Sequence, residues 1–225
     1  MIKAILIDVD NTLLDFNLSA GAAMEKCCER FGITFTAEFL PTFIRINDGL
    51  WAKIERGELT VEGLHEIRWN TVFAVLGVNF DGKVFEKAFL SALFDTAIPI
   101  EGALDIVKYL SEKYVLCTAS NAVHAQQMNR LKISGILPYL SHVFDSEQIG
   151  VKKPDPKFFD ACFNALSPIK KDEIVLIGDS LSADISGANV SGIKAVWFNR
   201  YDKAAPTGVE LFAAVSALGE IKNVL

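Results

Sequence analysis

The sequence contains few histidines and cysteines and no excess of positive charge. It has three histidines and four cysteines in 225 residues, and its formal net charge at pH 7 is −6. No two cysteines form a Cys-x-x-Cys pair and the histidines lack metal-ligand spacing, which favours reduced thiols over a disulfide framework. The negative net charge argues against a broad surface for a nucleic-acid backbone, so we expect no nucleic-acid polymer among the partners.

Long apolar runs are also missing. No run approaches the roughly 20 residues that span a bilayer, and the first one, residues 2–7, stops at Asp8 before reaching the length of a signal peptide. We therefore expect a soluble cytoplasmic protein with no membrane partner, either a monomer or a homodimer. The signatures Walker A, Gly-x-Gly-x-x-Gly, His-Glu-x-x-His and Gly-x-Ser-x-Gly are absent as well.

Four short apolar runs rich in β-branched residues predict buried strands of a parallel sheet. Helix-like stretches lie between the later runs, and this strand–helix alternation is typical of a doubly wound, Rossmann-like α/β fold. The predicted strands are residues 2–7, 114–118, 173–177 and 194–198, and the predicted helices between them are residues 103–113, 122–134, 156–166 and 182–191.

The segment that follows the first strand has a different pattern. It has no strand run and reads as four amphipathic helices, three of which are followed by a glycine at the position that helix C-caps favour. We therefore predict an all-helical cap domain over residues 16–95, inserted into an α/β core formed by residues 1–15 and 96–225. The cap helices are predicted at residues 20–31, 37–56, 61–76 and 83–94, with Gly32, Gly57 and Gly77 behind the first three.

Carboxylates follow two of the predicted strands. Asp8 and Asp10 come after the first strand, and Asp179 and Asp184 after the third. Because parallel strands present their carboxyl ends to one crevice, we expect these side chains to converge. Any one of them could simply cap a helix, but that explains a set of four poorly. Carboxylates without histidine suit a hard ion, so the predicted cofactor is Mg²⁺ and not Zn²⁺.

Hydroxyl, amide and ammonium groups occur near the same predicted edge. Ser120 and Asn121 follow the second strand and could hold an anion at the start of a helix, although a plain N-cap is the alternative. Lys152 and Lys153 precede Pro154, and one of the two could reach inward to a phosphate while the other stays solvated. Thr118 competes with Ser120 for the hydroxyl position.

The order of these residues resembles the motifs of the haloacid dehalogenase-like hydrolase superfamily, and the helical insertion resembles its C1-type cap. The resemblance implies that Asp8 is a nucleophile forming an aspartyl-phosphate and that Asp10 is the general acid and base. The matching motifs are residues 8–13 (Asp-Val-Asp-Asn-Thr-Leu), Ser120, Lys153 before Pro154, and residues 178–184 (Gly-Asp-Ser-Leu-Ser-Ala-Asp).

The same resemblance implies a ligand set. Mg²⁺ would be held by the side chains of Asp8 and Asp179 and by the backbone carbonyl of Asp10. Asp184 would either orient Lys153 or support metal-bound water. Phosphoryl oxygens would be bound by Ser120, Asn121 and Lys153.

The substrate is expected to be a small phosphomonoester. Asp10 favours phosphoryl transfer, because 2-haloacid dehalogenase relatives lack this second aspartate. Residues 8–16, 56–68 and 126–131 resemble the pyrimidine 5′-nucleotidase-like group, while phosphoglycolate phosphatase, sugar-phosphate phosphatase and phosphoglucomutase stay open as alternatives. The cap should act as a lid that supplies selectivity. Its candidate substrate contacts are Phe16, Arg45, Trp51, Arg68 and Trp69, although aromatic residues at helical spacing are more often core.

Overall fold

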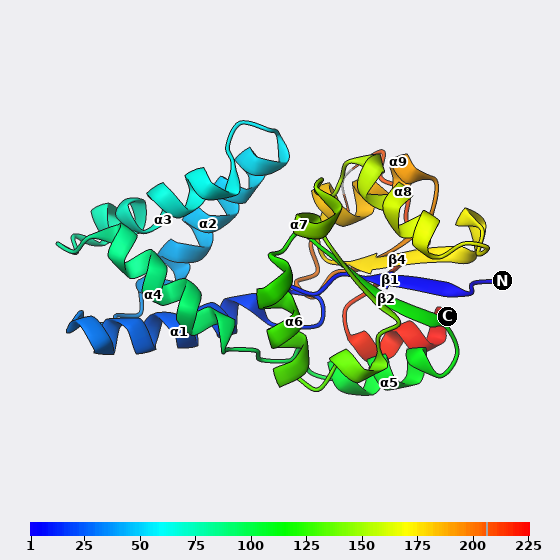
Figure 1. The fold of residues 1–225 in the computed structure, drawn as a ribbon, viewed down its shortest axis with the longest axis horizontal. Helices are drawn as coiled ribbons and strands as arrows, with labels where there is room; N and C mark the ends of the chain where they lie inside the picture. Colours follow the sequence, from blue (N-terminus) through cyan, green and yellow to red (C-terminus); the bar gives the residue numbers. More distant parts are fainter. Residues whose placement is uncertain (206) are drawn as a thin grey trace. The chain divides into compact units, whose positions relative to one another are not determined.

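The computed structural model describes residues 1–205 and 207–225, and its central element is a six-stranded parallel sheet. The strand order is β3-β2-β1-β4-β5-β6, so the chain winds outward from β1 in both directions (Figure 1). This arrangement confirms the predicted fold class. The strands are β1 (Ala4–Ile7), β2 (Val115–Ser120), β3 (His142–Asp145), β4 (Ile174–Gly178), β5 (Lys194–Phe198) and β6 (Ala213–Val215).

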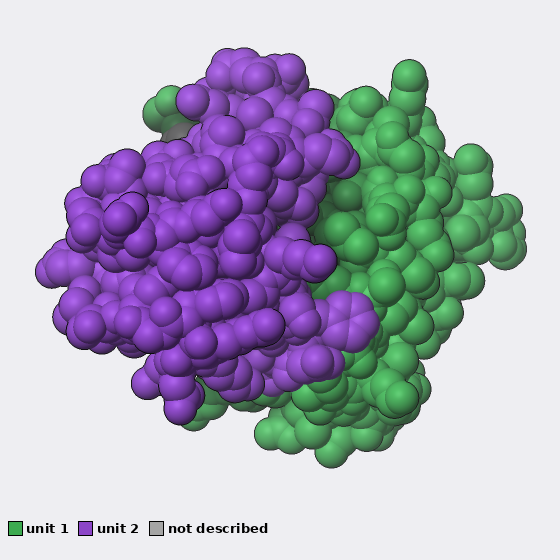
Figure 2. All heavy atoms as spheres, turned by 60° about the vertical axis from the view of Figure 1, so that its left-hand side comes forward, with its two compact units in different colours: residues 1–15, 99–225 green, residues 16–98 purple. Residues whose placement is uncertain are grey.

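The chain divides into two compact units, coloured separately in Figure 2. Unit 1 comprises residues 1–15 and 99–225 and contains the sheet, whereas unit 2 comprises residues 16–98 and is built of helices. Unit 2 contains α1 (Phe16–Phe31), α2 (Phe39–Glu55), α3 (Val61–Leu76) and α4 (Gly82–Phe94). Unit 1 contains α5 (Ala103–Ser111), α6 (His124–Ile133), α7 (Ser146–Ile149), α8 (Pro156–Ala165) and α9 (Ser186–Ser191), with shorter helical turns at Leu137–Tyr139, Lys171–Glu173, Leu181–Ile185 and Leu218–Asn223.

Strand β1 lies at the centre of the sheet because all four of its residues are apolar and can be buried on both faces. It pairs in parallel with β2 and β4, and Ile7 is in register with both Thr118 and Ile177. The backbone N–H of Asp8 continues the ladder by donating to the Ile177 carbonyl at 2.8 Å. This register brings the residues that follow β1, β2 and β4 to the same edge of the sheet.

Helices cover both faces of this sheet. In Figure 1, α8 and α9 lie on one side of it and α5 lies on the other. On the side of α8 and α9, Phe158, Phe159 and Leu176 are fully buried in one apolar cluster, which packs these helices against the sheet.

The core of unit 2 is aromatic and is centred on the fully buried Trp69. The rings of Phe43, Phe85 and Phe89 lie with their centroids 4.3 to 5.3 Å from that of Trp69. Such spacing is favourable for aromatic pairs and fixes how α2, α3 and α4 pack within the unit. Among the described residues, no helix of either unit is long and apolar enough to cross a membrane.

Two strands were not predicted from the sequence. Strand β3 has only four residues and its first three are partly or fully exposed, and β6 has only three residues, of which only Val215 is buried. Both are outer strands of the sheet, so neither needs the continuous apolar run that marks a central strand.

Candidate active site

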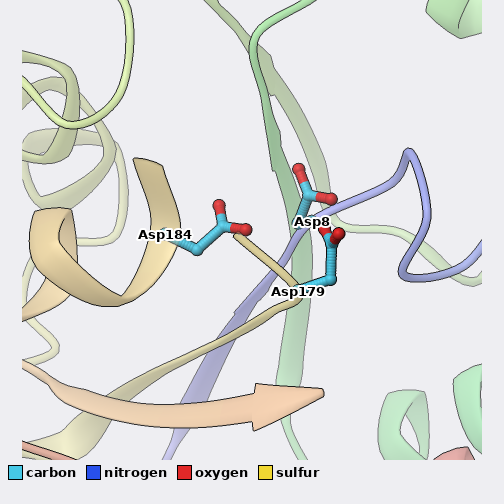
Figure 3. A group of neighbouring side chains, drawn as sticks. All are labelled: Asp8, Asp179 and Asp184. Carbon is cyan, nitrogen blue, oxygen red and sulfur yellow. The ribbon is translucent and has the colours of Figure 1, made fainter. Parts of the chain in front are cut away.

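Asp8, Asp179 and Asp184 converge at the carboxyl edge of the sheet. Asp8 follows β1, Asp179 follows β4, and Asp184 lies in the helical turn Leu181–Ile185. Figure 3 shows the three carboxylates directed toward one another, and one oxygen of each lies within 4.8 Å of the others. The register of β1 against β4 produces this grouping, as the position of the motifs predicted.

Lys153 connects two of these carboxylates. Its ammonium donates to Asp8 Oδ1 at 2.7 Å, to Asp184 Oδ1 at 2.6 Å and to the Ala119 carbonyl at 2.5 Å. The side chain is 2% exposed, whereas Lys152 is only half-buried. Of the two lysines that the sequence left open, Lys153 is therefore the one that lies in the cluster.

Asp184 is held on both of its oxygens. Lys153 contacts Oδ1, and the backbone N–H of Ser180 donates to Oδ2 at 3.0 Å. A Cβ atom added at Gly178 would lie 2.3 Å from the same Oδ2. Only glycine therefore leaves room for this carboxylate beside the end of β4.

When fully ionised, the cluster carries more negative than positive charge. Three carboxylates face one ammonium, and burial, followed by the neighbouring carboxylates, raises the pKa of Asp179 well above its ordinary value. Burial raises the pKa of Asp8 to about 7 against the opposing effect of Lys153. For Lys153 burial alone would lower the pKa, but Asp184 and Asp8 outweigh it and the net shift is upward. Buried oxygen ligands with excess negative charge suit a hard divalent cation such as Mg²⁺.

Asp10 lies next to this cluster and contacts a different set of groups. Its Oδ1 accepts a hydrogen bond from Arg130 Nη1 at 2.6 Å, and its Oδ2 accepts a long one from Gln127 Nε2 at 3.4 Å. Both partners lie on α6, three residues apart and hence on one helix face. The side chain of Asp10 is one-third exposed and that of Arg130 is 2% exposed. Asp10 does not share the oxygen grouping of the other three aspartates.

Ser120 and Asn121 both lie at this edge, in different surroundings. Ser120 is buried, and its hydroxyl accepts from Gln127 Nε2 at 3.2 Å. Asn121 accepts from the backbone N–H of Lys153 at 2.8 Å and donates to the Lys153 carbonyl at 3.0 Å. The Asn121 amide thus fixes the loop that presents Lys153, and its contact with a phosphate stays a prediction.

Thr118, the alternative to Ser120, is also fully buried, and within the described residues its hydroxyl has no hydrogen-bond partner.

Two hydrogen bonds hold Asp179 in place. The Thr12 hydroxyl donates to its carboxylate oxygen Oδ1 at 3.4 Å, and Trp197 Nε1 donates to the backbone carbonyl of Asp179 at 3.0 Å. These contacts tie the ends of β4 and β5 together.

The candidate substrate contacts of unit 2 differ in exposure. Arg45 is exposed and Trp51 is half-buried against the apolar core of the unit. Phe16 is also half-buried, with its ring centroid 6.4 Å from that of Phe43. Their contact with a substrate stays a prediction.

Arg68 and Trp69 lie in the interior of unit 2. Arg68 is 4% exposed and forms a two-point ion pair with Glu86 at 2.5 and 3.2 Å, while its Nη1 donates to Asn47 at 2.9 Å. Trp69 is the centre of the aromatic core. Internal partners therefore occupy the groups that the sequence offered as substrate contacts, and packing explains both positions.

Arg130 and Gln127 are site residues whose contacts the sequence reasoning missed. In the sequence, residues 126–131 contribute only to the resemblance to the pyrimidine 5′-nucleotidase-like group. The available signal was their spacing, because two polar side chains three apart on the first helix after Ser120 would share a face near the end of β2.

Residues 2–192 match the family described as haloacid dehalogenase-like hydrolase. The chain belongs to the haloacid dehalogenase-like hydrolases. It is 31% identical to the pyrimidine 5′-nucleotidase PynA of Streptococcus pneumoniae, over 91% of this chain and 89% of that protein, and 28% identical to the pyrimidine 5′-nucleotidase YjjG of Escherichia coli, over 98% and 96%. The crystal structure of the HAD-hydrolase YfnB of Bacillus subtilis bound to magnesium has a TM-score of 0.94, with 28% identity over 100% of this chain and 98% of that one.

Proposed function

We propose that this haloacid dehalogenase-like hydrolase is a Mg²⁺-dependent phosphomonoesterase that acts through a phosphorylated Asp8. The observation that carries the proposal is the buried Asp8 carboxylate, fixed by Lys153 and grouped with Asp179 and Asp184 at the carboxyl edge of the sheet. A carboxylate in such a position can attack phosphorus and form a covalent intermediate.

Asp8 and Asp179 would hold the cation, with Asp184 beside them. When bound, Mg²⁺ offsets the excess negative charge of the cluster and polarises the phosphoryl oxygens. The magnesium-bound relative YfnB supports this choice of metal for the present chain. By the resemblance, the Asp10 backbone carbonyl is a further proposed ligand. The Asp10 side chain contacts Arg130 and lies outside the oxygen grouping of the other three carboxylates.

The chain's own groups account for the two chemical steps. In the first, the bond from Asp8 oxygen to phosphorus forms, the ester bond breaks, and Asp10 gives a proton to the leaving alcohol. In the second, Asp10 takes a proton from the water that attacks phosphorus, and the Asp8 carboxylate is released with inorganic phosphate. Lys153 keeps Asp8 oriented, and with Ser120 it stabilises the charge on the transferred group.

Asp10 also separates this proposal from dehalogenation. A halide leaves as a stable anion and needs no proton, so a general acid beside the nucleophile has no use in that reaction. An alkoxide leaving group does need one. The presence of Asp10, paired with Arg130 and Gln127 beside the nucleophile, therefore supports ester hydrolysis.

For the substrate we propose a nucleoside 5′-monophosphate, with a pyrimidine preferred. The two pyrimidine 5′-nucleotidases that match nearly the whole chain support this choice. The test is kcat/KM across a panel of uridine, thymidine and adenosine 5′-monophosphates, ribose 5-phosphate, glucose 6-phosphate and phosphoglycolate. Pyrimidine monophosphates should give the highest values, and a sugar phosphate or phosphoglycolate that exceeds them would refute the preference while leaving the phosphatase proposal intact.

A further inference from the structure

Two side chains of α6 contact Asp10, whose carboxylate lies outside the oxygen grouping of Asp8, Asp179 and Asp184. Arg130 Nη1 donates to Oδ1 at 2.6 Å, and Gln127 Nε2 donates to Oδ2 at 3.4 Å. Both donors are buried, with Gln127 fully inaccessible and Arg130 2% exposed. The Asp10 side chain itself is one-third exposed, whereas both of its partners are buried.

The same two residues are linked to each other and to a predicted phosphate ligand. Arg130 Nη1 also lies 3.4 Å from Gln127 Oε1, and Gln127 Nε2 donates to Ser120 Oγ at 3.2 Å. One helix face therefore holds Asp10, which follows β1, in a fixed relation to Ser120, which ends β2. Charge-assisted hydrogen bonds of this kind restrict the orientation of a carboxylate more than neutral ones do.

We propose that Arg130, assisted by Gln127, is a positioning residue that aims the Asp10 carboxyl group at the leaving-group oxygen. The inference rests on the proposed function, because it concerns the proton that Asp10 transfers in that reaction. Arg130 transfers no proton and forms no bond to phosphorus. Its effect is to keep Asp10 in line, so that the proton moves as the ester bond breaks and returns from water in the second step.

A positioning role predicts a dependence on the leaving group. The leaving group of phenyl phosphate is a basic phenolate that needs a proton. The leaving group of 2,4-dinitrophenyl phosphate is a stable anion that does not. The ratio kcat/KM reports only the steps up to the loss of the phenol. In Arg130→Met it should fall on the order of 10²-fold for phenyl phosphate, the scale of a lost general acid. It should stay within about twofold of wild type for the dinitrophenyl ester.

The second step gives an independent readout. With the dinitrophenyl ester the first step is fast in Arg130→Met, so slow hydrolysis of phosphorylated Asp8 should limit kcat. A burst of dinitrophenolate, absent or smaller in the wild type, should then precede steady turnover. Arg130→Lys keeps the cation in a smaller form and should show the same selectivity with a smaller loss, which covers the case in which the methionine variant does not fold.

Arg200→Met provides the matched control. Arg200 also makes a 2.6 Å ion pair with an aspartate of the segment after β1, Asp15, but not with Asp10. Any effect of this variant should be equal for the two esters. Equal losses on both esters in the Arg130 variants, or no loss, would overturn the positioning role of Arg130 but leave the proposed function intact. A wild-type protein that hydrolyses neither ester would overturn the proposed function and this assignment with it.

Discussion

The ammonium of Lys153 lies 2.7 Å from the carboxylate of Asp8, although 145 positions separate the two residues in the chain. Both groups are almost inaccessible to water, and the lysine contacts Asp184 at 2.6 Å as well. The two ion pairs share one cation, so the orientation of the proposed nucleophile depends on a loop that the Asn121 side chain holds in place.

Substituting the proposed nucleophile, Asp8, tests the proposed covalent step. Asp8→Asn keeps the size of the side chain but removes its charge, so hydrolysis of p-nitrophenyl phosphate should fall below detection, a loss of at least about 10⁴-fold. When the reaction is quenched with acid during turnover, the intact mass should show a covalently bound phosphate in the wild type and none in Asp8→Asn. Asp160→Asn, on the exposed face of α8, is the control and should behave as wild type. Substantial turnover by Asp8→Asn would refute the proposed mechanism.

Removal of divalent cations tests the charge argument. After treatment with EDTA and gel filtration, activity on p-nitrophenyl phosphate should be lost, and addition of Mg²⁺ should restore it. The excess of carboxylates over Lys153 also predicts that Mg²⁺ stabilises the folded state, since it binds there and not to the unfolded chain. Thermal unfolding should therefore shift to higher temperature with Mg²⁺ in the wild type and by much less in Asp179→Asn. Full activity without metal would contradict the assignment.

Replacement of Lys153 should affect both activity and stability. Lys153→Met leaves the Asp8 and Asp184 carboxylates without their shared cation, which in a buried site costs on the order of 3–5 kcal/mol of unfolding free energy. The kcat should fall by about 10²–10³-fold because charge on the transferred phosphoryl group loses a donor. Urea unfolding and steady-state kinetics measure the two effects. Lys152→Met is the matched control and should show neither effect. A loss in this variant as large as in Lys153→Met would contradict the assignment of the role to Lys153 alone.

The Arg68–Glu86 pair predicts a stability effect confined to unit 2. Arg68→Leu leaves a buried carboxylate whose pKa burial already raises, so the free energy of unfolding should drop by roughly 3–5 kcal/mol. The double variant Arg68→Leu/Glu86→Leu should recover much of that loss, because no charge is then left unpaired. Arg56 makes a similar two-point contact with Glu58 at the surface, and Arg56→Leu should leave unfolding almost unchanged. A double variant no more stable than Arg68→Leu would argue against charge burial as the cause.

The strands and motifs at the carboxyl edge of the sheet could be predicted because they are local in the sequence. The apolar run of β1 and the carboxylate after it are adjacent, and the parallel register then places Asp8 near Asp179 without further information. The preference for Lys153 over Lys152 came from the resemblance, whose motif lysine directly precedes Pro154, and the loop that turns this side chain inward beside Asp184 gives its physical reason.

The interior role of Arg68 was hidden for a related reason. A single arginine in an amphipathic helix is normally a surface group, and its partner Glu86 lies on another helix 18 residues away. Arg130 belongs to the same class, because its contact with Asp10 spans 120 positions. Spacing within one helix can indicate which side chains share a face, but it does not indicate which residues of other elements contact that face.

The separation of Asp8 from its partners has a consequence for synthesis on the ribosome. The proposed nucleophile leaves the ribosome well before its partners, because Lys153 follows it by 145 residues and Asp184 comes later still. Strand β1 cannot complete its pairing until β4 has left the exit tunnel. Throughout that interval the nascent protein carries the aspartate without the groups that orient it, so truncated translation products should be inert toward cellular phosphate esters.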